Sequence, residues 1–146
     1  MINTLDKSHT FSWPVRVYYE DTDAGGIVFY ANYLKFFERA RTEWLRALGV
    51  HQKQMADEFR ALFVVKATAV EYHASARLDD ELSVTAQIEK TGRASVVFLQ
   101  EVWCGERLLA SAKVTACCVD MDQWRPMPIP SPILKLMNPQ LFANKV

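Results

Sequence analysis

Hydrophobic residues recur with two different periods along this chain, and the period changes near residue 62. Between Asn32 and Gly49 they recur at the spacing of one helix face, at Leu34, Phe37, Ala40, Trp44 and Leu48. From residue 62 onward they alternate with polar residues, as in strands that bury one face. The pattern therefore predicts one long helix packed against a sheet that comes mostly from the second half of the chain.

Five segments are predicted as strands: residues 11–19, 62–72, 82–90, 93–104 and 107–120. A short second helix is expected over residues 51–60. Short turns at residues 91–93 and 104–106 join the last three strands, which predicts an antiparallel meander. The predicted fold class is therefore α+β.

The segment after the last strand is rich in proline, with Pro126, Pro128, Pro130 and Pro132. Proline lacks the N–H that a sheet interior requires, so we expect this tail to be irregular. At 146 residues the chain has the length of one domain. We therefore expect a single domain over residues 1–146, with its core at about residues 12–130.

Composition excludes several classes of protein. Lys plus Arg and Asp plus Glu each count 17, so no basic excess favours nucleic acid as a partner. No apolar run approaches the roughly 20 residues of a membrane span, and the first residues lack the apolar core of a signal peptide. We therefore expect a cytoplasmic protein, in which Cys104, Cys117 and Cys118 are buried, reduced thiols.

Three carboxylates, Glu20, Asp21 and Asp23, precede Gly25 and Gly26 at the turn before the long helix. They can be solvated turn residues, one of which caps the helix. They can also be hard ligands for Mg²⁺, although no second acidic cluster accompanies them. A phosphate loop through the glycines is disfavoured, because the carboxylates would repel the phosphate. The fourth interpretation is a carboxylate that acts on a carbonyl group beside the N–H groups of the helix start.

The fourth interpretation suits a thioester better than an amide. A carboxylate is ionised at neutral pH and can attack a carbonyl or activate water, and a thiolate leaves without an acid to protonate it. GxSxG, HExxH and GxxxxGK[ST] motifs are absent from the sequence. Among the histidines only His73 lies in a strand that can reach a site, and a structural, hydrogen-bonded role is favoured for it.

Residues 14–49, PVRVYYEDTDAGGIVFYANYLKFFERARTEWLRALG, closely resemble the acyl-CoA thioesterases of the hotdog fold. The resemblance is to the group that contains 4-hydroxybenzoyl-CoA thioesterase and the bacterial Tol-Pal-associated acyl-CoA thioesterases. It extends over about residues 12–130, because the order and length of the predicted strands also match. It implies the hotdog fold, in which a five-stranded antiparallel sheet wraps around a long central helix.

The resemblance also implies roles for residues of the motif. Asp23 matches the catalytic carboxylate of the family, which acts as a nucleophile through a mixed anhydride or as a general base for water. Gly26 begins the segment that leads into the helix and lets the backbone approach the thioester, and the N–H of Tyr30 would polarise the thioester carbonyl. Asp21 would support the turn. Many Tol-Pal-associated members have His where this chain has Tyr30, whereas the 4-hydroxybenzoyl branch has Tyr, so the acyl group stays open.

Partners follow from the uncovered sheet and from the resemblance. One helix covers only part of one sheet face, which predicts a homo-oligomer, and the resemblance implies a dimer with joined sheets that often assembles into a homotetramer. Coenzyme A phosphates would meet surface cations, with Lys90 and Arg93 as first choice and Arg125 as second. An ordinary surface role is equally open for each. We expect no metal and no bound cofactor, since coenzyme A is part of the substrate.

The sequence thus predicts an enzyme that hydrolyses an acyl-CoA thioester to coenzyme A and a carboxylic acid. One alternative is a non-catalytic acyl-binding or envelope-associated protein linked to the Tol-Pal system, with a peripheral place at the inner membrane. An acyl-thioester hydratase or dehydratase is less favoured, because such enzymes use a histidine near the acid and residues 10–50 contain none.

Overall fold

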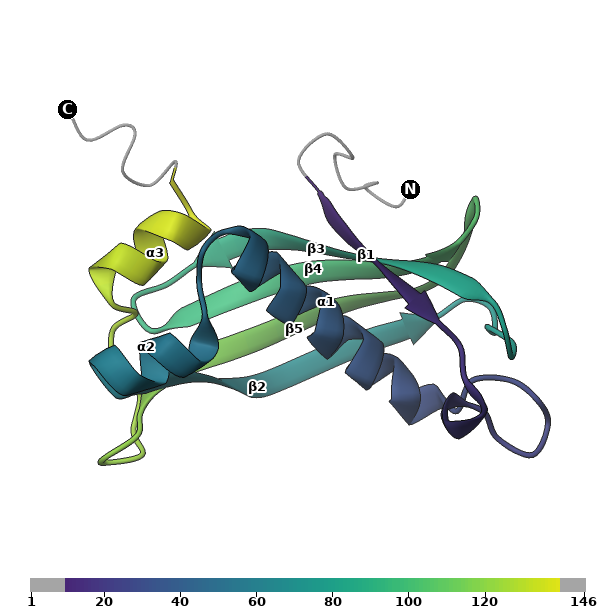
Figure 1. The fold of residues 1–146 in the computed structure, drawn as a ribbon, viewed down its shortest axis with the longest axis horizontal. Helices are drawn as coiled ribbons and strands as arrows, with labels where there is room; N and C mark the ends of the chain where they lie inside the picture. Colours follow the sequence, from purple (N-terminus) through teal and green to yellow (C-terminus); the bar gives the residue numbers. More distant parts are fainter. Residues whose placement is uncertain (1–9, 140–146) are drawn as a thin grey trace. The chain divides into compact units, whose positions relative to one another are not determined.

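The computed structural model of the protein describes residues 10–139 (Figure 1). The first nine residues, on which the signal-peptide expectation largely rests, lie outside this range. The elements in chain order are β1 (Phe11–Arg16), the 3-10 turns η1 (Tyr19–Asp21) and η2 (Tyr30–Asn32), α1 (Tyr33–Ala47), α2 (Gln52–Phe59), β2 (Ala61–Tyr72), β3 (Glu81–Thr91), β4 (Ser95–Cys104), β5 (Arg107–Asp120) and α3 (Ser131–Met137).

The strands form one five-stranded sheet in the order β1-β3-β4-β5-β2. The neighbours β3, β4 and β5 are the predicted meander, and β1 pairs antiparallel with β3 from Phe11 opposite Ala86 to Arg16 opposite Glu81. Pro14 lies in β1, an edge strand, where its missing N–H is tolerated. The α+β class with an antiparallel sheet and one long helix is therefore confirmed.

Contacts between residues divide the structure into two compact units. The first unit takes in residues up to Trp44 with residues 69–87 and 99–113. The second takes in residues 45–68 and 88–98 with the chain from Val114 onward. The acidic turn, the start of α1 and the cavities described below all belong to the first unit.

The first unit is organised around the buried face of α1. Phe36, Phe37 and Ala40 have no exposed surface. Leu34, which the sequence pattern places on the buried face, is 44% exposed, and Tyr33 is buried instead. The buried face therefore lies one residue earlier at the helix start than predicted, because Tyr33 packs edge-on against Phe36 and Tyr72.

A buried glutamine joins α1 to the sheet within this unit. Gln100 on β4 is 1% exposed, and its Nε2 donates to the carbonyl oxygens of Phe37 and Thr85, both at 3.0 Å. Its Oε1 accepts from Arg41 at 2.9 Å. Burial lowers the pKa of the Arg41 guanidinium, and the nearby Glu38 opposes that shift. One amide side chain thus satisfies polar groups from the helix and from the neighbouring strand.

The second unit corrects two expectations. The proline-rich tail is not irregular throughout, because α3 begins with Pro132 in its first turn and buries Ile133 and Met137. Proline is tolerated there, since the first helical N–H groups need no partner inside the helix. Of the two cysteines in this unit only Cys118 is buried, and burial raises its pKa to about 11, whereas Cys117 is partly exposed.

Cys104, in the first unit, is also partly exposed, so the expectation of buried thiols holds for Cys118 alone. Among residues 10–139, no helix combines the length and the apolar character that a membrane crossing would require.

Candidate active site

The acidic turn is held together by Asp21. This side chain is 3% exposed, and its carboxylate accepts hydrogen bonds from the Tyr18 N–H at 2.8 Å and from Asn32 Nδ2 at 2.5 Å. The 3-10 turn that it stabilises ends β1 at Arg16, three residues before the predicted end. Asn32 lies in η2 and directs its amide group to Asp21. Asp21 therefore ties the end of the first strand to the start of α1.

Asp23 lies two residues further on, in an exposed loop. Its backbone carbonyl accepts from the Gly26 N–H at 3.1 Å, and its Oδ1 accepts from the Gly25 N–H at 2.8 Å. Gly26 has φ +80°, a conformation that favours glycine, which explains its place in this turn. The second carboxylate oxygen of Asp23 has no hydrogen bond from the described residues and is free to act on a substrate.

A cavity of about 450 Å³ opens beside this carboxylate. It is lined by Asp23 and Tyr33 together with residues 27–30 and 72–75. The loop is fixed next to the far segment of the lining, because the Val28 N–H donates at 2.9 Å to the carbonyl of Ala76, the residue that follows this segment. Two segments far apart in sequence thus form one cavity, with a carboxylate in its wall.

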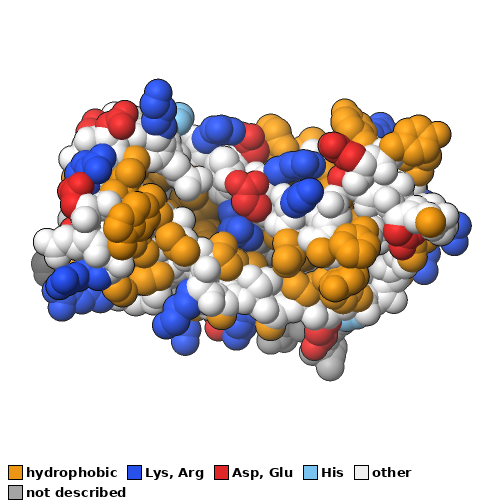
Figure 2. All heavy atoms as spheres, turned by 90° about the horizontal axis from the view of Figure 1, so that it is seen from below, with side chains coloured by type: hydrophobic (Ala, Val, Ile, Leu, Met, Phe, Trp, Pro, Cys, Tyr) orange, Lys and Arg blue, Asp and Glu red, His pale blue; other side chains and the backbone are white. Residues whose placement is uncertain are grey.

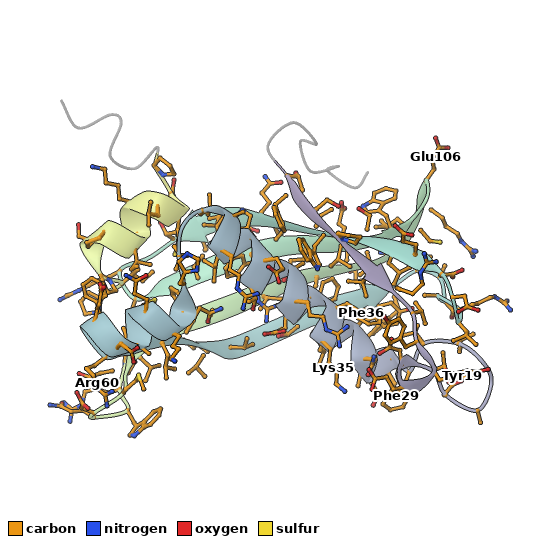
Figure 3. The ribbon with its side chains drawn as sticks, in the orientation of Figure 1. Tyr19, Phe29, Lys35, Phe36, Arg60 and Glu106 are labelled. Atoms are coloured by element: carbon orange, nitrogen blue, oxygen red, sulfur yellow. The ribbon has the colours of Figure 1, made fainter. Side chains whose placement is uncertain are left out.

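Aromatic rings form much of the wall of this cavity. The rings of Phe29 and Tyr30 lie 4.9 Å apart, and Tyr72 contacts both Tyr30 and Tyr33, at 6.3 and 5.4 Å between ring centroids. Phe29 lies beside the start of α1 (Figure 3), whereas Phe36, on the helix itself, is buried and does not line the cavity. An apolar wall of this kind can exclude water from an acyl group.

Two tyrosine hydroxyls connect the helix start to the end of β2 and to the segment that follows it. Tyr72 donates to the Tyr30 carbonyl at 2.8 Å, and Tyr33 accepts from the Ala76 N–H at 3.1 Å. Burial raises the pKa of both phenols. Tyr30 and Tyr33 add to the shift at Tyr72, and the bond from Ala76 opposes it at Tyr33. Both phenols therefore remain protonated at neutral pH and cannot serve as bases.

Backbone donors lie at the same end of the helix. The first N–H groups of a helix have no partner inside it and carry the positive end of its dipole. In η2, which leads into α1, the Asn32 N–H donates to Phe29, so the first N–H groups are those of Tyr30 and Ala31. A carboxylate and helix-start donors in one wall can attack a carbonyl carbon and stabilise the resulting oxyanion.

His73 also borders the cavity, but its ring is engaged elsewhere. Its Nε2 lies 3.1 Å from Ser111 Oγ on β5, and its backbone N–H donates to the Leu109 carbonyl. His73 directly follows β2, and Ser111 lies on β5, the strand next to β2 in the sheet, so the ring is engaged by the sheet. This agrees with the structural role expected from the sequence.

The cations proposed for coenzyme A belong to the second unit. Lys90 is at the end of β3, Arg93 is in the turn before β4, and Arg125 is in the segment after β5; all three are exposed. None of them lines the cavity beside Asp23. Their contact with coenzyme A therefore stays a prediction.

Sequence reasoning missed Tyr33 and Tyr72 as parts of the site. Tyr72 bonds a residue 42 positions away, and no local pattern indicates such a pair. A second cavity, of about 510 Å³, is lined by hydroxyl groups and by Glu101 and Glu106, but contains no helix start. No group of three or more metal-ligating side chains is found among residues 10–139. The cavity beside Asp23 is therefore the candidate active site.

Comparison with known proteins agrees with this geometry. Residues 17–137 match the family model of the thioesterase-like superfamily. The chain is 47% identical to an acyl-CoA thioester hydrolase YbgC of Escherichia coli O6:H1, over 85% of this chain and 92% of that protein. It is 45% identical to an acyl-CoA thioesterase YbgC of Haemophilus influenzae, over 84% of this chain and 90% of that protein.

Among solved structures, a probable thioesterase from Bartonella henselae superposes with a TM-score of 0.79 at 31% identity, covering 83% of this chain and 99% of that one. The matched region contains the acidic turn and the four strands β2 to β5. The chain therefore belongs to the thioesterase-like superfamily and has its hotdog fold.

Proposed function

We propose that this protein is an acyl-CoA thioesterase, which converts an acyl-CoA and water into coenzyme A and a carboxylic acid. The observation that carries the proposal is that the Asp23 carboxylate and the start of α1 line the same cavity. The names of the relatives from Escherichia coli and Haemophilus influenzae support the same reaction. The motif that contains Asp23, Gly26 and Tyr30 lies within the matched region.

In the proposed mechanism the thioester carbonyl carbon lies beside the free oxygen of Asp23. Either this oxygen attacks the carbon and forms a mixed anhydride, which water then hydrolyses, or it takes a proton from a water that attacks. In both routes negative charge develops on the carbonyl oxygen, where the Tyr30 N–H donates a hydrogen bond. The carbon–sulfur bond then breaks, and the thiolate leaves without a general acid. Gly26 permits the turn that places Asp23.

The test is release of free thiol by the purified full chain from a panel of acyl-CoA substrates with short, long and aromatic acyl groups. Turnover of at least one substrate is expected, without added metal or cofactor. Saturable binding of acyl-CoA with no thiol release from any member of the panel would show that the protein binds acyl-CoA without hydrolysing it.

Lys90, Arg93 and Arg125 are proposed to bind the phosphates of coenzyme A. Exposed ion pairs contribute about 0.2–1 kcal/mol each, so a Lys90→Ala, Arg93→Ala double variant, which removes two of them, should raise KM by about two-fold to thirty-fold. The matched substrate is the same acyl group on pantetheine, which lacks those phosphates. An equal rise of KM for the pantetheine thioester would refute the phosphate contact.

The protein is also proposed to form a homo-oligomer through β2. Sedimentation distinguishes a dimer from a tetramer. β2 is an edge strand, and most of its residues are exposed, including Val64 and Val65 at 44% and 46%. Figure 2, which views the molecule from below, shows groups of hydrophobic side chains between charged ones on this face. An exposed apolar edge of this kind favours pairing with a second copy.

Val64→Lys with Val65→Lys is expected to reduce the mass measured by analytical ultracentrifugation to that of the monomer. The control is Trp124→Lys, which changes a residue that is 68% exposed and lies outside β2. Wild-type protein that sediments as a monomer at micromolar concentration would contradict the proposal.

A further inference from the structure

The helix start at the candidate site is held by a hydroxyl group from the far segment of the cavity wall. Tyr72 Oη lies 2.8 Å from the Tyr30 carbonyl oxygen. Ring contacts with Tyr30 and Tyr33 fix the phenol in this place. The bond joins the last residue of β2 to the first residue of η2, which leads directly into α1.

This hydrogen bond acts on one particular peptide group. The Tyr30 carbonyl and the Ala31 N–H belong to the same planar amide and point in opposite directions. A donor at the carbonyl polarises the amide and makes its N–H a stronger donor, because hydrogen bonds in a chain reinforce one another. The Ala31 N–H has no partner inside the helix, since it lies in the first turn.

Toward the Tyr30 carbonyl Tyr72 acts as the donor, because a carbonyl oxygen can only accept. Burial and the neighbouring phenols of Tyr30 and Tyr33 raise its pKa, so the hydroxyl keeps its proton throughout the neutral range. The hydroxyl proton is directed at a backbone carbonyl and not at the Asp23 carboxylate.

We infer that Tyr72 is a positioning residue for thioester hydrolysis: its hydroxyl orients and polarises the Tyr30–Ala31 peptide, so that the Ala31 N–H joins the Tyr30 N–H in binding the thioester oxygen. This inference rests on the proposed function. It gives a role in the chemistry to Tyr72, the last residue of β2, which lies outside both the acidic motif and α1.

The first test is Tyr72→Phe, which keeps the ring and removes only the hydroxyl. We expect kcat to fall about ten-fold while KM changes by less than about two-fold, because the lost stabilisation is greatest when charge develops on the oxygen. The matched control is Tyr19→Phe, at a tyrosine that is 81% exposed and does not line the cavity (Figure 3). Its kcat should equal that of the wild type.

A second measurement separates donation from packing. Replacing Tyr72 by 3-fluorotyrosine leaves the shape almost unchanged but makes the phenol a stronger donor, so kcat should rise above the wild-type value. Thermal unfolding of each variant checks the fold, and the fluorinated protein decides the question if Tyr72→Phe does not fold. If the hydroxyl only supported the fold, kcat would not depend on how strongly the phenol donates.

The results distinguish the inference from the function on which it rests. If the wild type releases thiol and folded Tyr72→Phe has the same kcat, the inference is overturned and the proposed thioesterase function stands. A fluorinated protein with a kcat no higher than that of the wild type would also overturn it. A wild-type protein that releases no thiol from any acyl-CoA would overturn the proposed function first, and the inference with it.

Discussion

Asp23→Asn is expected to abolish thiol release, with a fall in kcat on the order of 10²–10⁴-fold or more. The amide oxygen of asparagine can still accept the Gly25 N–H bond that Asp23 Oδ1 accepts, so the loop should keep its conformation. The amide can neither attack the thioester nor take a proton from water. Steady-state kinetics on the best substrate, with thermal unfolding of the same samples, measures both effects.

Asp21→Asn is the matched control, because it changes a carboxylate two residues away in the same turn. Asp21 is buried and accepts from two donors, and an asparagine would place its own NH₂ against one of them. We expect a loss of about 1–3 kcal/mol in the free energy of unfolding and a much smaller loss of kcat than in Asp23→Asn. Full activity in Asp23→Asn, or a larger catalytic loss in Asp21→Asn, would reverse these assignments.

Gln100→Ala is expected to give the largest loss of stability, about 3–5 kcal/mol in the free energy of unfolding. The substitution leaves a cavity at a site that is 1% exposed and removes both bonds from Nε2 and the bond from Arg41. The guanidinium of Arg41 then loses its acceptor on β4. Denaturant unfolding followed by circular dichroism measures the change.

Gln100→Leu separates volume from hydrogen bonding, since leucine fills most of the space but offers no polar atom. It should cost about 1–3 kcal/mol, less than Gln100→Ala. Adding Arg41→Met should recover part of that loss, because it removes the unsatisfied guanidinium. Stability equal to the wild type in Gln100→Leu would mean that the hydrogen bonds of Gln100 contribute nothing net to the fold.

Much of the fold was predictable because its signals are local. The change from helical to alternating periodicity near residue 62 predicted α1 and the strands β2 to β5 to within one or two residues. Errors arose where a distant contact decides the conformation. β1 ends early because the buried Asp21 stabilises a 3-10 turn, and α3 forms in the tail because the buried side chains of Ile133 and Met137 stabilise it.

The sequence by itself predicted the order of elements from β1 to β5, the membership of the family and Asp23 as the candidate catalytic residue, because periodicity and a long motif are properties of neighbouring residues. Only the tertiary structure decided that Asp21 is buried, that Gln100 joins the helix to the sheet, and that Tyr72 holds the Tyr30 carbonyl. The physical reason is the same in each case. These hydrogen bonds join groups 11 to 63 residues apart, and such pairs become visible only when folding brings the two groups together.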